Sequence, residues 1–157
     1  MSTARTVLII DDQQDLLKSI ARVLKLDDYE VESSGSLAET LARSRWDHFD
    51  VILLDRKLLD GLAEDLLPRL NELAPQASVV IATGYADLES SIQAMRFGAE
   101  DYLVKPVHPD VLRQTLARIM RVKEAEQKVI ESERLAMVGQ MMAVLAHESG
   151  NALARAQ

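Results

Sequence analysis

Short apolar runs alternate with amphipathic stretches along the first 120 residues of the chain. The apolar runs do not alternate polar with apolar side chains, which is typical of strands buried on both faces of a parallel sheet. They are residues 6–10, 29–33, 51–55, 78–83 and 101–105. Between them, apolar residues recur at helical spacing over residues 14–26, 36–45, 63–73 and 88–96, and again from 109 onward. This pattern predicts an α/β fold, a doubly wound five-stranded parallel sheet with right-handed crossovers.

A long C-terminal helix is predicted from Pro109 onward, because no further proline follows and helix-favouring residues are frequent. Residues 121–134 are mostly charged, so we interpret them as a helical linker between a domain at 1–120 and a last segment at 135–157. Two apolar stripes at heptad spacing are offset by one residue: Val122, Ala125 and Val129, then Leu135, Val138, Met142 and Leu145. The stripes predict a coiled-coil helix that supports a weak homodimer, with a local change of winding between them.

The formal net charge of −7 lies on the first 120 residues, because five basic and five acidic residues cancel from Arg121 onward. Binding to a nucleic-acid backbone needs clustered Lys and Arg, so we expect no nucleic-acid partner for this sequence. An acidic excess is expected of a domain that gathers carboxylates around a cation.

The absence of cysteine excludes a disulfide framework and thiolate metal ligands. No apolar run approaches the length that crosses a bilayer, and the N-terminus does not have the pattern of a signal peptide. We therefore expect a cytoplasmic location and no membrane contact for this sequence, while a membrane-anchored parent stays an open alternative.

Polar residues end the predicted strands. Asp11 and Asp12 follow the first strand, Asp55 ends the third, Thr83 the fourth and Lys105 the fifth. In doubly wound sheets the site lies beyond the carboxyl ends of the strands, so these side chains are expected to converge. Three close carboxylates repel one another unless a cation lies among them, and hard oxygen ligands favour Mg²⁺. A carboxylate nucleophile, a metal, a hydroxyl and an ammonium together suit phosphoryl transfer.

Four segments resemble the signatures of response-regulator receiver domains. They are Val7-Leu-Ile-Ile-Asp11-Asp12, Val51-Ile-Leu-Leu-Asp55-Arg-Lys-Leu-Leu-Asp60-Gly61, Val79-Val-Ile-Ala-Thr83-Gly84-Tyr85 and Gly98-Ala-Glu-Asp-Tyr102-Leu-Val-Lys105-Pro106. The resemblance covers about three-quarters of the chain and implies the flavodoxin-like receiver fold. One departure is Leu59, where the family often has proline before Asp-Gly, and this affects the stiffness of the loop.

The resemblance also implies a role for each matching residue. Asp55 becomes the phosphoacceptor, Asp11, Asp12 and Asp55 hold Mg²⁺ with the Lys57 carbonyl, Thr83 and Lys105 bind the phosphoryl group, and Tyr102 acts as an aromatic switch. The Lys105–Pro106 bond is expected to be cis. Lys57 and Tyr85, each two residues after a site residue, are expected to shield the acyl phosphate. Asp15 and Asp60 are interpreted as ordinary helix-capping carboxylates, and His48 and His108 as loop residues without partners.

Residues 133–153 resemble the dimerisation and phosphoacceptor helix of histidine kinases, through Gly-Gln-Met-Met-Ala-Val-Leu-Ala-His147-Glu148 and Asn151. The resemblance implies that His147 is a phosphoacceptor, Glu148 its acid/base neighbour and Asn151 a further site residue. With Met142 and Leu145 on the heptad seam, His147 falls on the outer face of the helix. Gly150 and Ala152 stand where that family usually has a basic residue and a proline.

The preferred interpretation is a two-component phosphorelay protein. A receiver, phosphorylated by an upstream histidine kinase or phosphotransfer protein, would regulate an attached kinase module in a hybrid sensor kinase. The sequence contains no ATP-binding lobe, so it is not expected to autophosphorylate. One alternative is a non-catalytic response regulator whose C-terminal helix only dimerises or docks a partner. Another is a transcription factor whose DNA-binding part lies outside this sequence.

Overall fold

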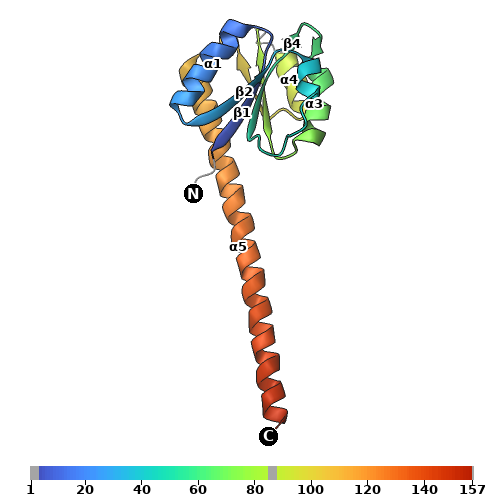
Figure 1. Cartoon of the computed structure of the whole chain (residues 1–157), viewed down its shortest axis with the longest axis vertical. Coiled ribbons are helices and arrows are strands. Elements are labelled where there is room, and N and C mark those ends of the chain that lie inside the picture. Colours follow the sequence, from blue (N-terminus) through green and yellow to red (C-terminus); the bar gives the residue numbers. More distant parts are fainter. Residues whose placement is uncertain (1–3, 85–87, 157) are drawn as a thin grey trace. The chain divides into compact units, whose positions relative to one another are not determined.

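The computed structural model describes residues 4–84 and 88–156, with a parallel sheet of five strands in the order β2-β1-β3-β6-β7 (Figure 1). These strands are β1 (Arg5–Ile10), β2 (Tyr29–Ser34), β3 (Val51–Asp55), β6 (Ser78–Thr83) and β7 (Asp101–Val104). The helices are α1 (Gln14–Leu26), α2 (Leu37–Leu41), α3 (Ala63–Leu73), α4 (Leu88–Arg96) and α5 (Pro109–Arg155). The predicted fold class is confirmed, and each predicted strand agrees with its observed bounds to within one residue.

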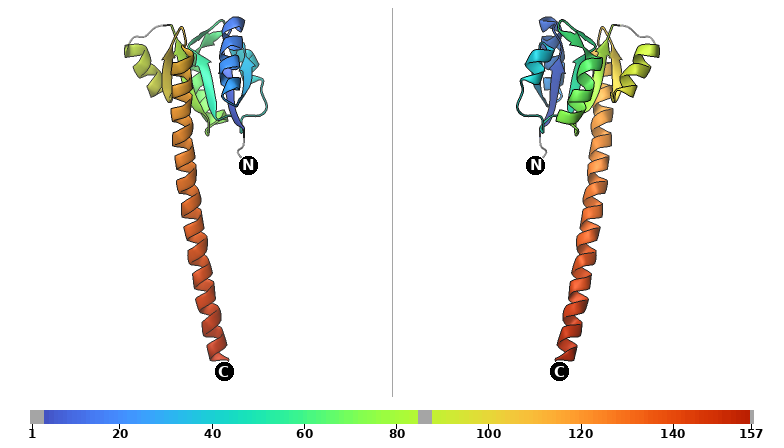
Figure 2. Two further views of the ribbon diagram at one scale, coloured as in Figure 1. Left: turned by 90° about the vertical axis from the view of Figure 1, so that its left-hand side faces the viewer. Right: turned by 90° about the vertical axis from the view of Figure 1, so that its right-hand side faces the viewer.

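The chain forms two compact units that meet within α5, one up to Ala117 and the other from Arg118. In the first unit α1 and the first turns of α5 cover one face of the sheet, and α2, α3 and α4 cover the other (Figure 2). Both faces of the central strands are therefore buried: Val7, Leu8, Val51 and Ile52 have no exposed surface. Each fully buried aliphatic side chain of this kind contributes roughly 1.5–3 kcal/mol to the stability of the fold. Strands that bury both faces therefore consist of unbroken apolar runs.

Helix α2 is shorter than the predicted segment 36–45, which is a correction to the sequence interpretation. Its start is as expected, since the Ser36 hydroxyl accepts the Glu39 N–H at 3.1 Å. Its end is earlier because the following chain turns inward to bury Trp46 and Phe49. The Trp46 indole N–H donates to the Arg43 carbonyl at 3.2 Å, which holds this turn. Burial of two aromatic rings outweighs the modest helix propensity of residues 42–45.

His48 was expected to lack a partner, and this is wrong. Its Nε2 lies 2.8 Å from Glu32 Oε1, and Arg43 pairs with the other oxygen of the same carboxylate. The His48 ring also lies over Phe49, with the ring centroids 4.0 Å apart. We call Glu32, Arg43 and His48 the Glu32 cluster; it joins β2 to the loop before β3. The two interactions with basic groups lower the pKa of Glu32 despite the opposing effect of its burial.

The second unit is a single helical segment, residues 118–155 of α5, and nearly all of its side chains from Arg121 onward are exposed. Several large apolar side chains lie on it, including Leu135, Val138, Met142 and Leu145, which are each at least half exposed. Among the described residues, no helix combines the length and the apolar character that a membrane span requires.

Candidate functional site

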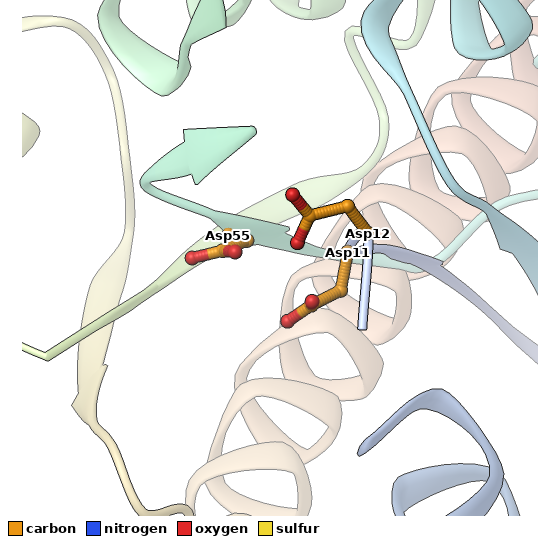
Figure 3. Close-up of side chains that lie close together, drawn as sticks. All are labelled: Asp11, Asp12 and Asp55. Carbon is orange, nitrogen blue, oxygen red and sulfur yellow. The ribbon is translucent and has the colours of Figure 1, made fainter. Parts of the chain in front are cut away.

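Three carboxylates meet at the carboxyl edge of the sheet. Strand β1 pairs with β3 in parallel, Ile10 beside Leu54, so the residues that follow in each strand are also neighbours. Asp11 and Asp12 come from the end of β1 and Asp55 from the end of β3 (Figure 3). One oxygen of each carboxylate lies within 4.8 Å of the others. The convergence predicted from the sequence is therefore observed.

Lys105 brings an ammonium group to the same edge from the end of β7. Its Nζ lies 2.8 Å from Asp11 Oδ2 and 3.2 Å from Asp55 Oδ1. The Lys105 backbone N–H donates to the Thr83 carbonyl at 2.7 Å, and the peptide bond to Pro106 is cis, as expected. Burial acts to lower the pKa of Lys105, but the hydrogen bond and charge of Asp11, together with those of Asp55, raise it overall. The ammonium is therefore held charged within the carboxylate cluster.

The surroundings of Asp55 disfavour its ionised form. It is 9% exposed, and burial followed by the charge of Asp11 raises its pKa, although Lys105 acts in the opposite direction. Three carboxylates and one ammonium leave a formal charge of −2 at this edge. A divalent cation with oxygen ligands matches that charge and donor set, and the described residues supply no sulfur or imidazole ligand there. The residues present thus fit Mg²⁺.

The other predicted site residues lie close by in the topology. Thr83 ends β6, which pairs with β3 so that Asp55 stands beside Ala82, and its side chain is buried. Tyr102 lies in β7 and is half-buried against the hydrophobic core. Lys57 is exposed, and its backbone N–H points to Asp55 Oδ1 at 3.5 Å. Tyr85, the second expected shielding residue, lies outside the described residues.

A two-stranded hairpin after Asp55 was missed by the sequence analysis. It consists of β4 (Lys57–Leu58) and β5 (Gly61–Leu62), paired antiparallel. Asp60 lies in the turn of this hairpin. The sequence interpretation, in which it caps the helix that follows, is wrong. Its carboxylate instead accepts the backbone N–H groups of Leu37 at 2.9 Å and Ala38 at 3.1 Å. No periodicity signals a bond across more than 20 residues, and only the Asp-Gly pair marked the turn.

His147, Glu148 and Asn151 all lie on the exposed part of α5. The Asn151 amide nitrogen is 3.2 Å from His147 Nε2, as the i,i+4 spacing of a helix allows. These three residues belong to the second unit, where the expected seam residues Met142 and Leu145 are exposed as well, so the outward position of His147 stays a prediction.

A five-stranded parallel sheet with an aspartate cluster and a lysine at its carboxyl edge defines a receiver-type phosphoacceptor domain. The sequence model of the response regulator receiver domain matches residues 7–117, and the chain belongs to this family. PilR, a response regulator protein of Pseudomonas aeruginosa, is 36% identical over 155 residues, which cover 96% of this chain and 34% of that protein.

Solved structures agree with this assignment. A CheY-like receiver domain from Methanospirillum hungatei is 33% identical with a TM-score of 0.73, over 79% of this chain and 99% of that one. A response regulator from Burkholderia pseudomallei, with a phosphorylated aspartic acid, a calcium ion and citrate, is 28% identical with a TM-score of 0.65, over 78% and 72% of the two chains.

The present chain spans about a third of the length of several curated relatives, 29% of the AlgB regulator and 34% of PilR. The family match ends at residue 117, before the segment that resembles a kinase helix. These relatives are named response or transcriptional regulators, not kinases. The receiver is therefore shown, whereas the hybrid-kinase interpretation gains no support from them.

Proposed function

We propose that Asp55 accepts a phosphoryl group and that the receiver thereby switches the output of the attached helix. The observation that carries this proposal is the cluster itself, in which Asp55, Asp11 and Asp12 share one edge with the Lys105 ammonium. Receiver domains take their phosphate from a histidine kinase or a phosphotransfer partner. The phosphorylated aspartate of the Burkholderia relative supports the same chemistry here.

In the proposed reaction an Asp55 carboxylate oxygen attacks the phosphorus of a phosphohistidine or a small acyl phosphate. A new O–P bond forms while the P–N or P–O bond of the donor breaks, and the leaving group departs with the bonding electrons. Lys105 and the Thr83 hydroxyl would stabilise the phosphoryl oxygens, as preorganised donors do in a buried site. Withdrawal of Lys105 from the carboxylates toward those oxygens is the expected first change.

Asp11, Asp12, Asp55 and the Lys57 carbonyl would hold Mg²⁺. When bound, the ion supplies charge neutralisation for a phosphoryl group that arrives among carboxylates. Two contacts hold the Asp11 carboxylate at this edge: its Oδ1 accepts the Gln13 N–H at 2.9 Å, and its Oδ2 pairs with Lys105. Tyr102 is proposed to report the phosphorylated state by a change of rotamer.

The test is incubation with acetyl phosphate and Mg²⁺ followed by intact-mass measurement. One alkali-labile phosphate is expected in the wild type and none in Asp55→Asn. Asp65→Asn removes an exposed aspartate on α3 and should keep the adduct, which controls for loss of charge. An adduct that persists in Asp55→Asn would assign the phosphate to another residue.

We also propose that the helix pairs with a second copy of the chain. The large apolar side chains of residues 135–145 cover about half of the helix circumference, given 3.6 residues per turn. Such a face on a free helix gains stability only by burial. Met142→Glu should shift the chain to monomer in sedimentation, whereas Ala143→Glu, on the opposite side of the helix, should not. A wild type that is monomeric at every concentration tested would contradict the pairing.

A second candidate function concerns His147, and the observation that favours it is the hydrogen bond between the Asn151 amide nitrogen and His147 Nε2. As a phosphoacceptor, a neutral imidazole nitrogen would attack the phosphorus of phosphorylated Asp55, forming an N–P bond while the O–P bond breaks and the Asp55 carboxylate leaves. Glu148 would polarise the ring. An acid-labile, alkali-stable phosphate that requires both Asp55 and His147 would support transfer between them. An acid-stable adduct alone would leave the helix as a dimerising element of a non-catalytic regulator.

The identity of the module joined to the receiver has two candidates. The names of the relatives suggest a DNA-binding or transcription-activating part, while the resemblance of residues 133–153 suggests a kinase. The net charge of −7 argues that any contact with DNA would be made outside the present sequence. Reading the coding sequence at and beyond Gln157 separates these alternatives: the ATP-binding boxes of a kinase, a helix-turn-helix, or no extension at all.

A further inference from the structure

The hairpin that follows Asp55 is attached to a distant helix. Strand β4 begins only two residues after Asp55, and the turn residues are Leu59 and Asp60. Asp60 Oδ1 accepts the Leu37 N–H and Oδ2 accepts the Ala38 N–H. One carboxylate thus uses both of its oxygens on the first two residues of α2. The turn is held to α2 by contacts that span 22 and 23 residues of sequence.

The hairpin backbone also lies close to a side chain of α2. A Cβ atom at Gly61 would collide with Leu37 Cδ1, so this glycine allows the hairpin to approach α2 closely. Ser36 caps the next free N–H of α2, that of Glu39. The early N–H groups of this short helix are therefore divided between a local cap, Ser36, and the hairpin residue Asp60. The backbone hydrogen bonds also lower the pKa of Asp60, so it stays ionised and able to accept both.

The two turn residues add little stiffness of their own. Leu59 is 91% exposed, so its side chain contributes little packing. Proline is absent at this position, where φ has the negative sign that proline requires: among the described residues Asp28 is the only non-glycine with a positive φ. Proline is favoured at the first central position of such a turn because its ring fixes φ. The carboxylate of Asp60 therefore restrains the turn residues directly, in addition to the pairing of β4 with β5 and the bond from the Ala63 N–H to the Arg56 carbonyl at 2.9 Å.

We propose that Asp60 is a positioning residue for the phosphoacceptor site, whose tether to α2 fixes the hairpin and with it the Lys57 carbonyl beside Asp55. This rests on the proposed function, in which that carbonyl and the three carboxylates hold Mg²⁺. Lys57 lies in β4, three residues before Asp60, so movement of the turn displaces the carbonyl directly. The tether restricts the backbone of the turn, as a proline at position 59 would.

The test measures Mg²⁺ binding without any phosphodonor, from amide chemical shifts of Gln13 and Lys57 during titration with MgCl₂. Asp60→Ala should raise the half-saturating Mg²⁺ concentration by about 10-fold, the lower end of the range for residues that orient metal ligands. Amide hydrogen exchange across residues 57–62 should accelerate in the same variant. A Leu59→Pro/Asp60→Ala double variant should recover to within about twofold of wild type, because proline restricts the turn independently.

Ser36→Ala is the matched control, because it weakens the start of α2 while leaving the tether in place. It should lower the melting temperature without changing half-saturation by Mg²⁺. Equal shifts in Ser36→Ala and Asp60→Ala, or wild-type binding in Asp60→Ala, would overturn the positioning role. A wild type that neither binds Mg²⁺ nor takes phosphate from acetyl phosphate would instead overturn the proposed function.

Discussion

Replacement of Asp55 by Asn should stabilise the fold when no metal is bound. Burial of the Asp55 carboxylate costs several kcal/mol, here taken as about 3.5. Repulsion from Asp11, at no more than 4.8 Å between oxygens, adds about 3.5 kcal/mol at an effective dielectric constant of about 20. Attraction to Lys105 at 3.2 Å returns about 5 kcal/mol. The ionised carboxylate therefore destabilises the fold by about 2 kcal/mol, which Asn should relieve.

The dependence on pH follows from the direction of the pKa shift. Because the folded-state pKa of Asp55 is raised above the ordinary value of 3.8, the folded state binds this proton more tightly than the unfolded state does. The wild type thus loses stability relative to Asp55→Asn as pH rises from 3.8 through the folded-state pKa. The difference between the two proteins should be absent in acid and complete at neutral pH.

Thermal and urea unfolding in EDTA at neutral pH measure the effect, which corresponds to a rise of about 4–8 °C in melting temperature. Asp28→Asn is the control, since Asp28 is exposed and its positive φ suits Asn equally well. Excess Mg²⁺ should reverse the order, because ligand at about 100 times its dissociation constant adds about 2.7 kcal/mol to the protein that binds it. If Asp55→Asn is no more stable than wild type in EDTA, the electrostatic reasoning is refuted.

Two further predictions concern stability elsewhere. Gly98→Ala should lower the free energy of unfolding by about 1–2 kcal/mol, because Gly98 has φ of 94° and a Cβ there would meet the Asn71 amide. Gly139→Ala, in open space within α5, should raise it by up to about 1 kcal/mol. Urea denaturation of both variants checks the opposite signs. Glu32→Gln should lower stability by up to about 1 kcal/mol at neutral pH, since the Glu32 side chain is 40% exposed. Because the folded-state pKa of Glu32 is lowered, that difference should be full above pH 4.5 and vanish as pH falls through the folded-state value, and a pH-independent difference would contradict the assignment.

The sequence alone determined the sheet and the residues at its functional edge. Strands buried on both faces need unbroken apolar runs, and these runs end where the chain leaves the core. Asp11, Asp55, Thr83 and Lys105 mark such ends. The parallel topology then brings the ends of separate strands to one edge without any further information. The long helix could also be predicted from the sequence, because a proline-free segment of high helix propensity has few alternative conformations.

Only the tertiary structure decided what those elements attach to. The tether from Asp60 to α2, the Glu32 cluster and the early end of α2 all depend on contacts between residues distant in sequence. Hydrophobic periodicity reports which side of an element faces the core, and it carries no information about which polar group meets which. Such pairings form only after the core has placed the loops, because an exposed polar group bonds to whichever partner the packed chain presents. The residues that carry the chemistry were therefore visible in the sequence, whereas the residues that hold them in position became visible only in the fold.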